Sequence, residues 1–316
     1  MNQTLSFVFG YQGAFDLTKE EEDKLARDFP SCSFKFGPPN DFSDEEIMAA
    51  DVLVGQFNDQ QMRVAKNLKW LQASTVGLDR YNGYIDPEKT VVTNSQGLFN
   101  KCMGEHTFAM MIAYSRSIQR QRDSQNAHRW EIHDVPMGLF DRTVGVVGLG
   151  GIGADVAKKC KAFDMRVLGV RRDTSRKPEF VDEIYSFDEL DKVYAQADYL
   201  ILAVPLTDQT KHMINRESLK KMKPNAYLLN VGRGELVDTD ALVEALRNKT
   251  IAAAGLDTVY PEPLPSDHPL WGMPNVFITP HVANLSPTTN RFRFQFYYEN
   301  IRRYLAGEPL RNVCHC

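Results

Sequence analysis

Short apolar runs alternate with amphipathic stretches from about residue 143 onward. The run 143–148 ends in a glycine, and the stretch 154–163 that follows has the spacing of a helix. Five further apolar, β-rich runs occupy residues 165–170, 198–204, 226–231, 252–256 and 275–280. Helical stretches such as 238–249 lie between several of them. This alternation predicts a parallel sheet with helices on both faces, and therefore a doubly wound α/β domain of the Rossmann type.

The first hundred residues show a weaker version of the same alternation. Runs that predict strands occupy residues 5–10, 51–57, 68–74 and 91–94. Stretches that predict helices occupy residues 18–28, 44–49 and 60–66. We therefore expect a second, smaller α/β domain at this end of the chain.

Two long stretches are expected to connect the domains. Residues 104–124 contain no proline and no internal glycine, which predicts one long helix joining the two domains. The apolar spacing of residues 291–307 predicts a helix that returns to the first domain. We therefore predict a discontinuous first domain, made of residues 1–103 and 288–316, and a second domain of residues 104–287.

Length and charge narrow the class of protein. With 316 residues, of which 43% are hydrophobic, the chain can fill two cores. Its net charge of −4 argues against binding to nucleic acid or to a membrane surface through bulk electrostatics. No apolar run approaches the roughly 18–20 residues that a membrane span needs, and the first ten residues lack the pattern of a signal peptide. We expect a cytoplasmic protein without a nucleic-acid or membrane partner.

The cysteines indicate reduced thiols rather than a disulfide framework. There are five of them, scattered along the chain. The terminal run Cys314-His315-Cys316 could in principle hold a metal, but three adjacent positions close no usual zinc geometry, and a frayed terminus is the better interpretation. No HxxxH or CxxC pair accompanies the candidate segments described below, so we predict no catalytic metal.

The run GLGGIG is the first candidate for ligand chemistry. It places Gly148, Gly150 and Gly153 at GxGxxG spacing, directly after a predicted strand and at the start of a predicted helix. Such glycines permit a tight turn, close approach of the backbone to a pyrophosphate, and close packing of helix on strand. The spacing alone is a weak signal, but the strand and helix on either side supply the context it needs. We predict a dinucleotide site.

The residues after the next strand suggest which dinucleotide binds. An acidic residue that binds the ribose hydroxyls usually follows the glycines by about 20 positions. Here Arg171 and Arg172 occupy that place. Guanidinium groups match phosphate oxygens, which predicts NADPH in preference to NADH, with Thr174 as a further donor. The alternative is a solvated basic loop in which Asp173 supplies the acid, so NADH stays possible.

Three segments place reactive side chains at the carboxyl ends of predicted strands, where open α/β sheets bind ligands. Arg233 lies in NVGRGELVD, Asp257 and Glu262 lie in GLDTVYPEP, and His281 lies in TPHVAN. Reduction of a 2-keto acid needs a cation for the carboxylate, an acid for the developing alkoxide, and a carboxylate that keeps this acid protonated. Arg233, His281 and Glu262 suit these roles, and Glu262 is expected to raise the pKa of His281.

The chain resembles the D-isomer-specific 2-hydroxyacid dehydrogenase family from residue 68 to residue 313. Four elements carry the resemblance: GLGGIG, VPLTDQTKHMIN, the stretch from LKKMKPNAYLLNVGRG to GLDTVYPEP, and TPHVAN. It implies two Rossmann-like or flavodoxin-like domains with the active site in the cleft between them. Residues 1–103 and 288–316 would then bind the substrate, and residues 104–287 would bind the dinucleotide.

The resemblance also assigns roles to individual residues. It implies Arg233 as the substrate-binding arginine, Glu262 as the partner of the histidine, and His281 as the general acid/base. The implied substrate site comprises Thr75, Val76, Gly77, Phe99, Arg233 and His281, with the backbone of residues 75–77 holding the substrate carboxylate. The implied cofactor site comprises Gly148, Leu149, Gly150, Gly151, Ile152, Gly153, Arg171, Arg172, Thr174, Val204, Pro205, Val231, Gly232 and Asp257, the last of these meeting the nicotinamide carboxamide.

Within the family, the two arginines and PEPLPSDHPLW look like the glyoxylate/hydroxypyruvate reductase branch. Family members often have a small or polar residue at the position of Phe99. A phenyl ring there would narrow the substrate pocket or favour a 2-keto acid with an apolar side chain. Two alternatives remain open. Some relatives are NAD-sensing transcriptional co-regulators that keep the Arg/Glu/His set. An NAD-dependent phosphoglycerate dehydrogenase is the other, although no further domain follows residue 313.

Members of this family usually form homodimers through their cofactor domains. The segment 127–141 is rich in aromatic and apolar residues outside the regular pattern. It is equally well interpreted as the contact between two copies or as a cap on its own domain.

Overall fold

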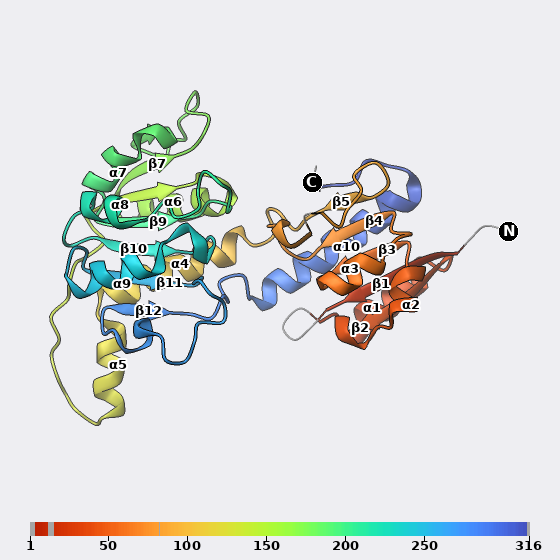
Figure 1. Cartoon of the computed structure of the whole chain (residues 1–316), viewed down its shortest axis with the longest axis horizontal. Coiled ribbons are helices and arrows are strands. Elements are labelled where there is room, and N and C mark those ends of the chain that lie inside the picture. Colours follow the sequence, from red (N-terminus) through yellow and green to blue (C-terminus); the bar gives the residue numbers. More distant parts are fainter. Residues whose placement is uncertain (1–3, 12–15, 82, 315–316) are drawn as a thin grey trace. The chain divides into compact units, whose positions relative to one another are not determined.

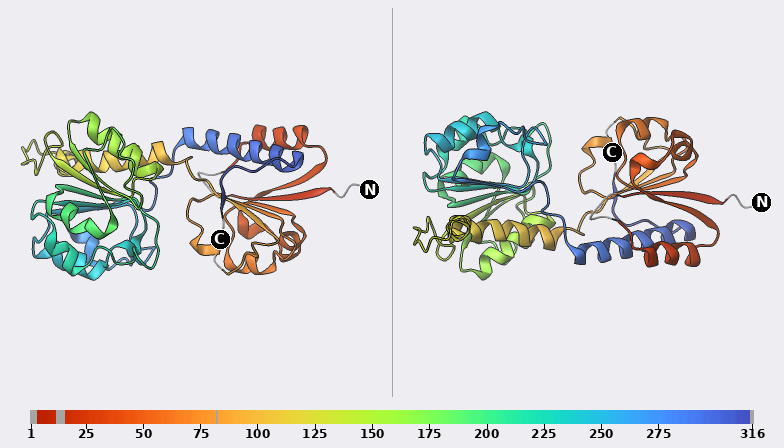
Figure 2. Two further views of the ribbon diagram at one scale, coloured as in Figure 1. Left: turned by 90° about the horizontal axis from the view of Figure 1, so that it is seen from above. Right: turned by 90° about the horizontal axis from the view of Figure 1, so that it is seen from below.

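The computed structural model describes residues 4–11, 16–81 and 83–314 and forms two compact units (Figure 1). Unit 1 comprises Met1–Phe99 and Leu285–Cys316, and unit 2 comprises Asn100–Asn284. Each unit has its own parallel sheet with helices on both faces, as the two edge-on views in Figure 2 show. The predicted fold class of two doubly wound α/β domains is confirmed.

Unit 2 contains a seven-stranded sheet in the order β12-β11-β10-β9-β6-β7-β8. Its strands are β6 (Thr143–Val147), β7 (Arg166–Val170), β8 (Glu183–Tyr185), β9 (Tyr199–Leu202), β10 (Tyr227–Asn230), β11 (Ala253–Leu256) and β12 (Val276–Ile278). Every neighbouring pair is parallel. The strand order reverses between β6 and β9, which is the point where ligands bind in doubly wound sheets.

Two apolar layers cover this sheet. One face packs against α4 (Asn100–Ser115) and α6 (Gly151–Ala162). The other packs against α7 (Leu190–Gln196), α8 (Arg216–Lys221) and α9 (Thr239–Arg247). Because both faces are covered, the central strands are continuous apolar runs rather than alternating ones.

Unit 1 contains a six-stranded sheet in the order β13-β5-β4-β3-β1-β2. Its strands are β1 (Leu5–Gly10), β2 (Cys32–Gly37), β3 (Val52–Gly55), β4 (Trp70–Ala73), β5 (Val91–Thr93) and β13 (Val313–Cys314). All neighbours are parallel except β13, which runs antiparallel to β5 at the sheet edge. The strand order of the unit reverses between β1 and β3.

Helices from both ends of the chain cover the unit 1 sheet. Helices α1 (Lys19–Asp28) and α10 (Pro287–Ala306) contribute to the apolar cluster on one face, and α2 (Asp44–Ala49) and α3 (Asp59–Val64) contribute to the cluster on the other (Figure 2). Capping boxes begin α1, α2 and α3, and each supplies side-chain acceptors for the first-turn amides.

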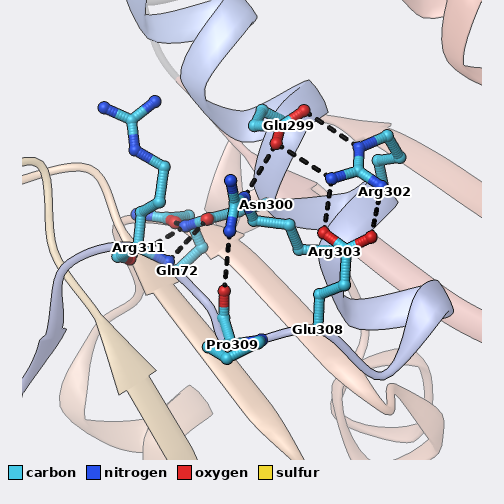
Figure 3. Close-up of polar contacts among 8 residues, drawn as sticks. All are labelled: Gln72, Glu299, Asn300, Arg302, Arg303, Glu308, Pro309 and Arg311. Atoms are coloured by element: carbon cyan, nitrogen blue, oxygen red, sulfur yellow. Dashed lines mark hydrogen bonds and ion pairs between the residues drawn. The ribbon is translucent and has the colours of Figure 1, made fainter.

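The C-terminal segment is fixed to unit 1 by a buried amide (Figure 3). Asn300 of α10 is fully buried, and its amide exchanges hydrogen bonds with the backbone of Arg311 at 3.0 and 3.1 Å. The same amide donates to Oε1 of Gln72 on β4 at 3.0 Å. Arg302 bridges Glu299 and Glu308 on the more exposed side. These contacts hold the strand that follows α10 against the sheet.

The expectation of one long helix over residues 104–124 is wrong. The structure has α4 and then α5 (Ile118–Asn126), with a break at Ser117, whose φ of 51° is left-handed. The Ser117 hydroxyl donates to the carbonyl of Asp134 at 2.9 Å, so a tertiary contact stabilises the break. No proline or glycine in this part of the sequence indicates it.

The unit boundaries and three strands also differ from the expectation. The boundary expected between residues 103 and 104 lies inside α4, and the structure divides the chain before Asn100 and after Asn284 instead. Strands β2, β8 and β13 were not expected. All three lie at or next to a sheet edge, where burial is incomplete and the apolar signal is weak.

Candidate active site

The glycine loop lies between β6 and α6, at the point where the strand order of unit 2 reverses. Gly148 has a φ of 96°, and a side chain there would meet the carbonyl of Ala203 on the neighbouring strand. A side chain at Gly150 would have no atom within 4 Å. The loop therefore needs glycine at the first position for its turn, and it leaves open space above the second.

The start of α6 suits an anion. Gly150 is the N-cap, and no side chain of the described residues caps this helix, in contrast to α1, α2 and α3. First-turn N–H groups at the positive end of a 12-residue helix thus point into the open space above the loop. This donor set fits the pyrophosphate of a dinucleotide, with residues 148–153 holding it.

Arg171 and Arg172 follow β7 directly. The backbone of Arg171 is fixed by its N–H bond to the carbonyl of Tyr185 at 3.1 Å, and Arg172 is exposed. Neither arginine forms an ion pair with a carboxylate among the side chains that the structure describes. The glycine loop is tied to the same strand end, since the N–H of Gly148 donates to the carbonyl of Val170 at 2.9 Å.

Asp173, the alternative acid for the ribose, is held by its own loop. Its Oδ1 accepts from the backbone N–H of Ser175 at 2.9 Å. Hydrogen bonds from Ser175 lower the pKa of the Asp173 carboxyl, and the charge of Arg171 adds to this effect. The carboxylate therefore stays ionised with a partner in its own turn.

The remaining cofactor candidates lie at the same edge of the sheet. Val204 and Pro205 follow β9, and Val231 and Gly232 follow β10. A side chain at Gly232 would meet the carbonyl of Val204, so glycine is needed for these two loops to approach each other. Leu149, Gly151 and Ile152 belong to the glycine loop and the first turn of α6.

His281 and Glu262 form a hydrogen-bonded pair. Nδ1 of His281 lies 2.9 Å from Oε2 of Glu262, and both side chains are partly exposed. Partial burial alone would raise the pKa of the Glu262 carboxyl. The hydrogen bond and charge of His281, the N–H of Val259 and the charge of Arg233 outweigh burial and lower that pKa. Glu262 is therefore a carboxylate that engages Nδ1 and leaves Nε2 as the nitrogen able to exchange a proton with a ligand.

Arg233 lies just after β10 and acts on this pair electrostatically. Its backbone carbonyl accepts from the side-chain amide of Asn230 at 2.8 Å, and Nη1 donates to the carbonyl of Gly232 at 3.0 Å. Its charge contributes to the lowered pKa of Glu262. The structure thus brings together the three side chains that the sequence nominated for the chemistry.

Asp257 holds the segment that carries His281. It is 2% exposed, and its carboxylate accepts from the Thr279 hydroxyl at 2.6 Å. It also accepts from the N–H groups of Val282 and Ala283 at 3.0 and 3.1 Å. Its carbonyl accepts from the N–H of His281, whose φ of 55° is unusual for a residue other than glycine. The backbone conformation of His281 therefore depends on Asp257.

His106 and Thr279 also belong to this cluster, although the sequence pattern did not indicate them. Nε2 of His106, on α4, lies 3.0 Å from the Thr279 hydroxyl and 3.5 Å from Oδ1 of Asp257. Thr279 lies two residues before His281, and this closeness in the sequence was only a weak indication that Thr279 lies near the site. Nothing in the sequence ties His106 to residues that lie more than 150 positions later.

Three of the substrate candidates of unit 1, Thr75, Val76 and Gly77, form the loop after β4. The carbonyl of Thr75 accepts from Ser95, the carbonyl of Val76 from Asn94, and that of Gly77 from the Thr75 hydroxyl. Among the described residues, no acceptor is hydrogen-bonded to the backbone N–H of Val76 or of Gly77. Phe99 is 3% exposed, at the end of unit 1.

The structure gives two further negative findings. No group of three or more His, Cys, Asp or Glu side chains that could hold a metal occurs within residues 4–11, 16–81 and 83–314. The terminal His315 and Cys316, considered above as metal ligands, lie outside the described residues. None of the described helices is both long and apolar enough to span a membrane.

Comparison with known proteins identifies the family. Residues 108–283 match the model of the D-isomer specific 2-hydroxyacid dehydrogenase NAD-binding domain. The chain belongs to the D-isomer-specific 2-hydroxyacid dehydrogenase family. It is therefore an oxidoreductase, with a dinucleotide-binding domain of this family in unit 2.

Three relatives illustrate the similarity. A glyoxylate reductase of Korarchaeum cryptofilum is 33% identical over 280 residues, which are 85% of this chain and 84% of the relative. A family member from Aeromonas salmonicida has a TM-score of 0.87 and 29% identity, over 99% of both chains. One from Xanthobacter autotrophicus, solved with NADPH and MES, has a TM-score of 0.81 and 28% identity, over 99% of this chain and 98% of that one.

The role of Asp257 in fixing the His281 segment gives a prediction. In Asp257→Asn, a side-chain NH₂ group replaces one carboxylate oxygen. This NH₂ group then faces a backbone N–H, so two buried donors meet without an acceptor between them. We expect the free energy of unfolding to fall by about 2–3 kcal/mol, measured by urea denaturation. The control Asp267→Asn, at an exposed position of the same unit, should change it by less than about 0.5 kcal/mol. A similar stability for both variants would contradict the assigned role.

Proposed function

We propose that the chain is an NADPH-preferring reductase of small 2-keto acids, such as glyoxylate, hydroxypyruvate or a larger relative. The observation that carries this proposal is the pair of His281 Nδ1 and Glu262 Oε2, 2.9 Å apart, on the same sheet edge as the glycine loop. The similarity to a named glyoxylate reductase supports the choice of substrate class.

His281 is the proposed proton donor in the reduction. Its Nδ1 is engaged by the Glu262 carboxylate, so Nε2 is the nitrogen that can pass a proton to the keto oxygen. The bound nicotinamide would supply the hydride to C2 of the keto acid. The products would be the 2-hydroxy acid, the oxidised dinucleotide and a neutral His281, which regains its proton from solvent before the next turnover.

Arg233 and the loop after β4 are proposed to hold the carboxylate of the keto acid. A guanidinium presents two parallel donors to a carboxylate, and its positive charge stabilises the negative charge that develops on the keto oxygen. The N–H groups of Val76 and Gly77 would supply further donors. In this proposal Phe99 limits the substrate side chain, and Asp257 serves the cofactor amide chiefly by fixing the backbone after Thr279.

The catalytic proposal predicts a large effect at His281. His281→Ala should lower kcat/KM with NADPH and glyoxylate, hydroxypyruvate or pyruvate by about 10²–10⁴-fold, because the proton donor is lost. In Glu262→Gln, kcat/KM should fall less than in His281→Ala, because the imidazole remains but the carboxylate that engages its Nδ1 is gone. Steady-state rates between pH 5 and 9 measure both effects.

The control for this experiment is His212→Asn, an exposed histidine with a positive φ that asparagine also tolerates. It should retain wild-type rates. Turnover by His281→Ala equal to that of the wild type would exclude the mechanism. A wild type that binds NADPH but reduces none of the acids would favour a cofactor-sensing role instead.

The cofactor preference is tested at Arg171 and Arg172. We propose that their guanidinium groups bind the 2′-phosphate, since Asp173 is occupied by Ser175. The double variant Arg171→Ala/Arg172→Ala should lower kcat/KM for NADPH by about 10–100-fold and leave the value for NADH within about threefold. Arg247→Ala, an exposed arginine at the end of α9, is the matched control. Equal or better wild-type activity with NADH would refute the preference.

We further propose a homodimer that forms through the segment 127–141 of unit 2. Trp130 and Ile132 are 102% and 95% exposed, so they cap nothing in their own unit, and Phe140 is 74% exposed. Apolar side chains exposed to this extent on one segment favour contact with another copy. The long loop after α5 that carries them is visible in Figure 1.

The dimer proposal predicts that Trp130→Glu combined with Ile132→Asp gives a monomer at micromolar concentration, as measured by analytical ultracentrifugation. Both substitutions place a charge in the proposed contact, where it would be desolvated. The control Phe292→Glu, an exposed aromatic residue on α10 of unit 1, should remain dimeric. A monomeric wild type at the same concentration would contradict the proposal.

A further inference from the structure

A histidine outside the proposed catalytic pair is joined to Asp257 within unit 2. His106 lies on α4, and its side chain is 22% exposed. Its Nε2 lies 3.0 Å from the hydroxyl of Thr279 and 3.5 Å from Oδ1 of Asp257. Thr279 directly follows β12 and Asp257 directly follows β11, so three separate elements meet in this contact. His106 belongs neither to the proposed substrate site nor to the proposed cofactor site.

The hydrogen bonds of this cluster run in one direction. The Asp257 carboxylate accepts from the N–H groups of Val282 and Ala283 and from the Thr279 hydroxyl at 2.6 Å. A hydroxyl has a single hydrogen, and that of Thr279 is directed to Asp257. The Thr279 oxygen therefore accepts from His106, so Nε2 of His106 is a nitrogen that carries a hydrogen. The order of donation is thus His106 to Thr279 to Asp257.

A chain of hydrogen bonds of this kind strengthens its last member. A donor on the Thr279 oxygen polarises the hydroxyl, so the hydrogen bond that the hydroxyl gives to Asp257 becomes stronger. Without His106, the hydroxyl would lose the contact that fixes its orientation and could turn away from the carboxylate. Asp257 is the residue whose contacts hold the backbone of His281. The imidazole on α4 therefore acts on the position of His281 through two intervening residues.

The start of α4 also contacts the glycine loop. A side chain at Gly151 would collide with the side-chain amide of Asn100, so this amide packs directly on the loop. Sγ of Cys102 donates to the carbonyl of Asn284 at 3.5 Å, at the end of the segment that carries the proposed proton donor. Asn100, Cys102 and His106 lie within the first two turns of the helix. These two turns therefore touch both the dinucleotide loop and the segment of the proton donor.

We propose that His106 is a positioning residue of the reductase. Through the Thr279 hydroxyl it fixes the Asp257 carboxylate, and thereby the backbone that places His281 for proton transfer. This inference rests on the proposed function, since a reductase needs its proton donor in place when the hydride is transferred. Arg233 follows β10, a different strand from those that precede Asp257 and Thr279. Binding of the keto acid carboxylate should therefore depend little on His106.

The first measurement needs no turnover. Amide hydrogen exchange of the full chain is followed by mass spectrometry on the peptide that covers residues 279–284. In His106→Leu this peptide should exchange about tenfold faster or more, because one hydrogen bond of the cluster is lost. His106→Gln should keep most of the protection, since its amide can donate to Thr279 in place of Nε2. Glu105→Leu, at the exposed neighbouring position on α4, is the matched control and should exchange as the wild type does.

A double-mutant cycle shows whether His106 acts through Thr279. Thr279→Val removes the hydroxyl, so the peptide should again exchange faster than in the wild type. Adding His106→Leu to Thr279→Val should change the exchange rate by less than about twofold, because the connection to Asp257 is already broken. Thr279→Ser keeps the hydroxyl and should keep the protection. If His106→Leu does not fold, the two variants of Thr279 carry the same test.

Turnover then tests the consequence for the reaction. His106→Leu should lower kcat with NADPH and glyoxylate by about 10–100-fold, because the proton donor is displaced, and KM for glyoxylate should stay within about threefold. His106→Gln should bring kcat to within about threefold of the wild type. A role of His106 as the proton donor itself would not allow this recovery, because an amide does not titrate. A loss of packing alone would lower the unfolding midpoint and would leave kcat of the folded enzyme unchanged.

Three results would overturn the inference. One is wild-type exchange of the peptide, or a wild-type kcat, in His106→Leu. Another is that the effects of His106→Leu and Thr279→Val add in the double variant. The third is that His106→Gln is as impaired as His106→Leu. Failure of the wild type to reduce any 2-keto acid would refute the proposed reductase function, and the exchange measurement would still decide whether His106 holds the segment at Asp257.

Discussion

The order of the sheet edge that carries His281 in unit 2 depends on one buried carboxylate. Asp257 directly follows β11, and both of its oxygens accept hydrogen bonds from the segment that follows β12. A buried carboxylate without such donors would be costly, so the segment has little freedom to move away from it. His281 gains its left-handed backbone conformation from this arrangement, and Glu262 can then meet Nδ1. The histidine is thus placed by backbone contacts more than by packing of its own ring.

Both units have a glycine at the point where the strand order of the sheet reverses. In each sheet the strand order reverses once, between β6 and β9 in unit 2 and between β1 and β3 in unit 1. At both reversals a glycine with a positive φ ends or follows a strand, Gly148 in one and Gly55 in the other, and each is packed against a neighbouring carbonyl. Glycine at these points lets the backbone approach the neighbouring strand end closely.

Much of this organisation could be predicted from the sequence, for identifiable reasons. The central strands are mostly apolar and the glycine loop has fixed spacing, so the fold class and the sheet edge that bears Arg233, Glu262 and His281 could both be predicted. The break at Ser117 was not, because it depends on a hydrogen bond to Asp134. Edge strands such as β2 gave too little apolar signal. The contacts of His106 were out of reach because residues far apart in the sequence form them.

The distribution of arginine explains how a chain with a net charge of −4 can serve anionic ligands. Arg171 follows β7 and Arg233 follows β10, so both come after the carboxyl ends of parallel strands. Many of the lysines and arginines elsewhere are paired with acids on the surface, where exposed pairs add little stability. Net charge reports mainly on solubility, whereas the local charge at the strand ends decides what binds. Under the proposed function, a dinucleotide phosphate would meet Arg171 and a keto acid carboxylate would meet Arg233 on a protein that is negative overall.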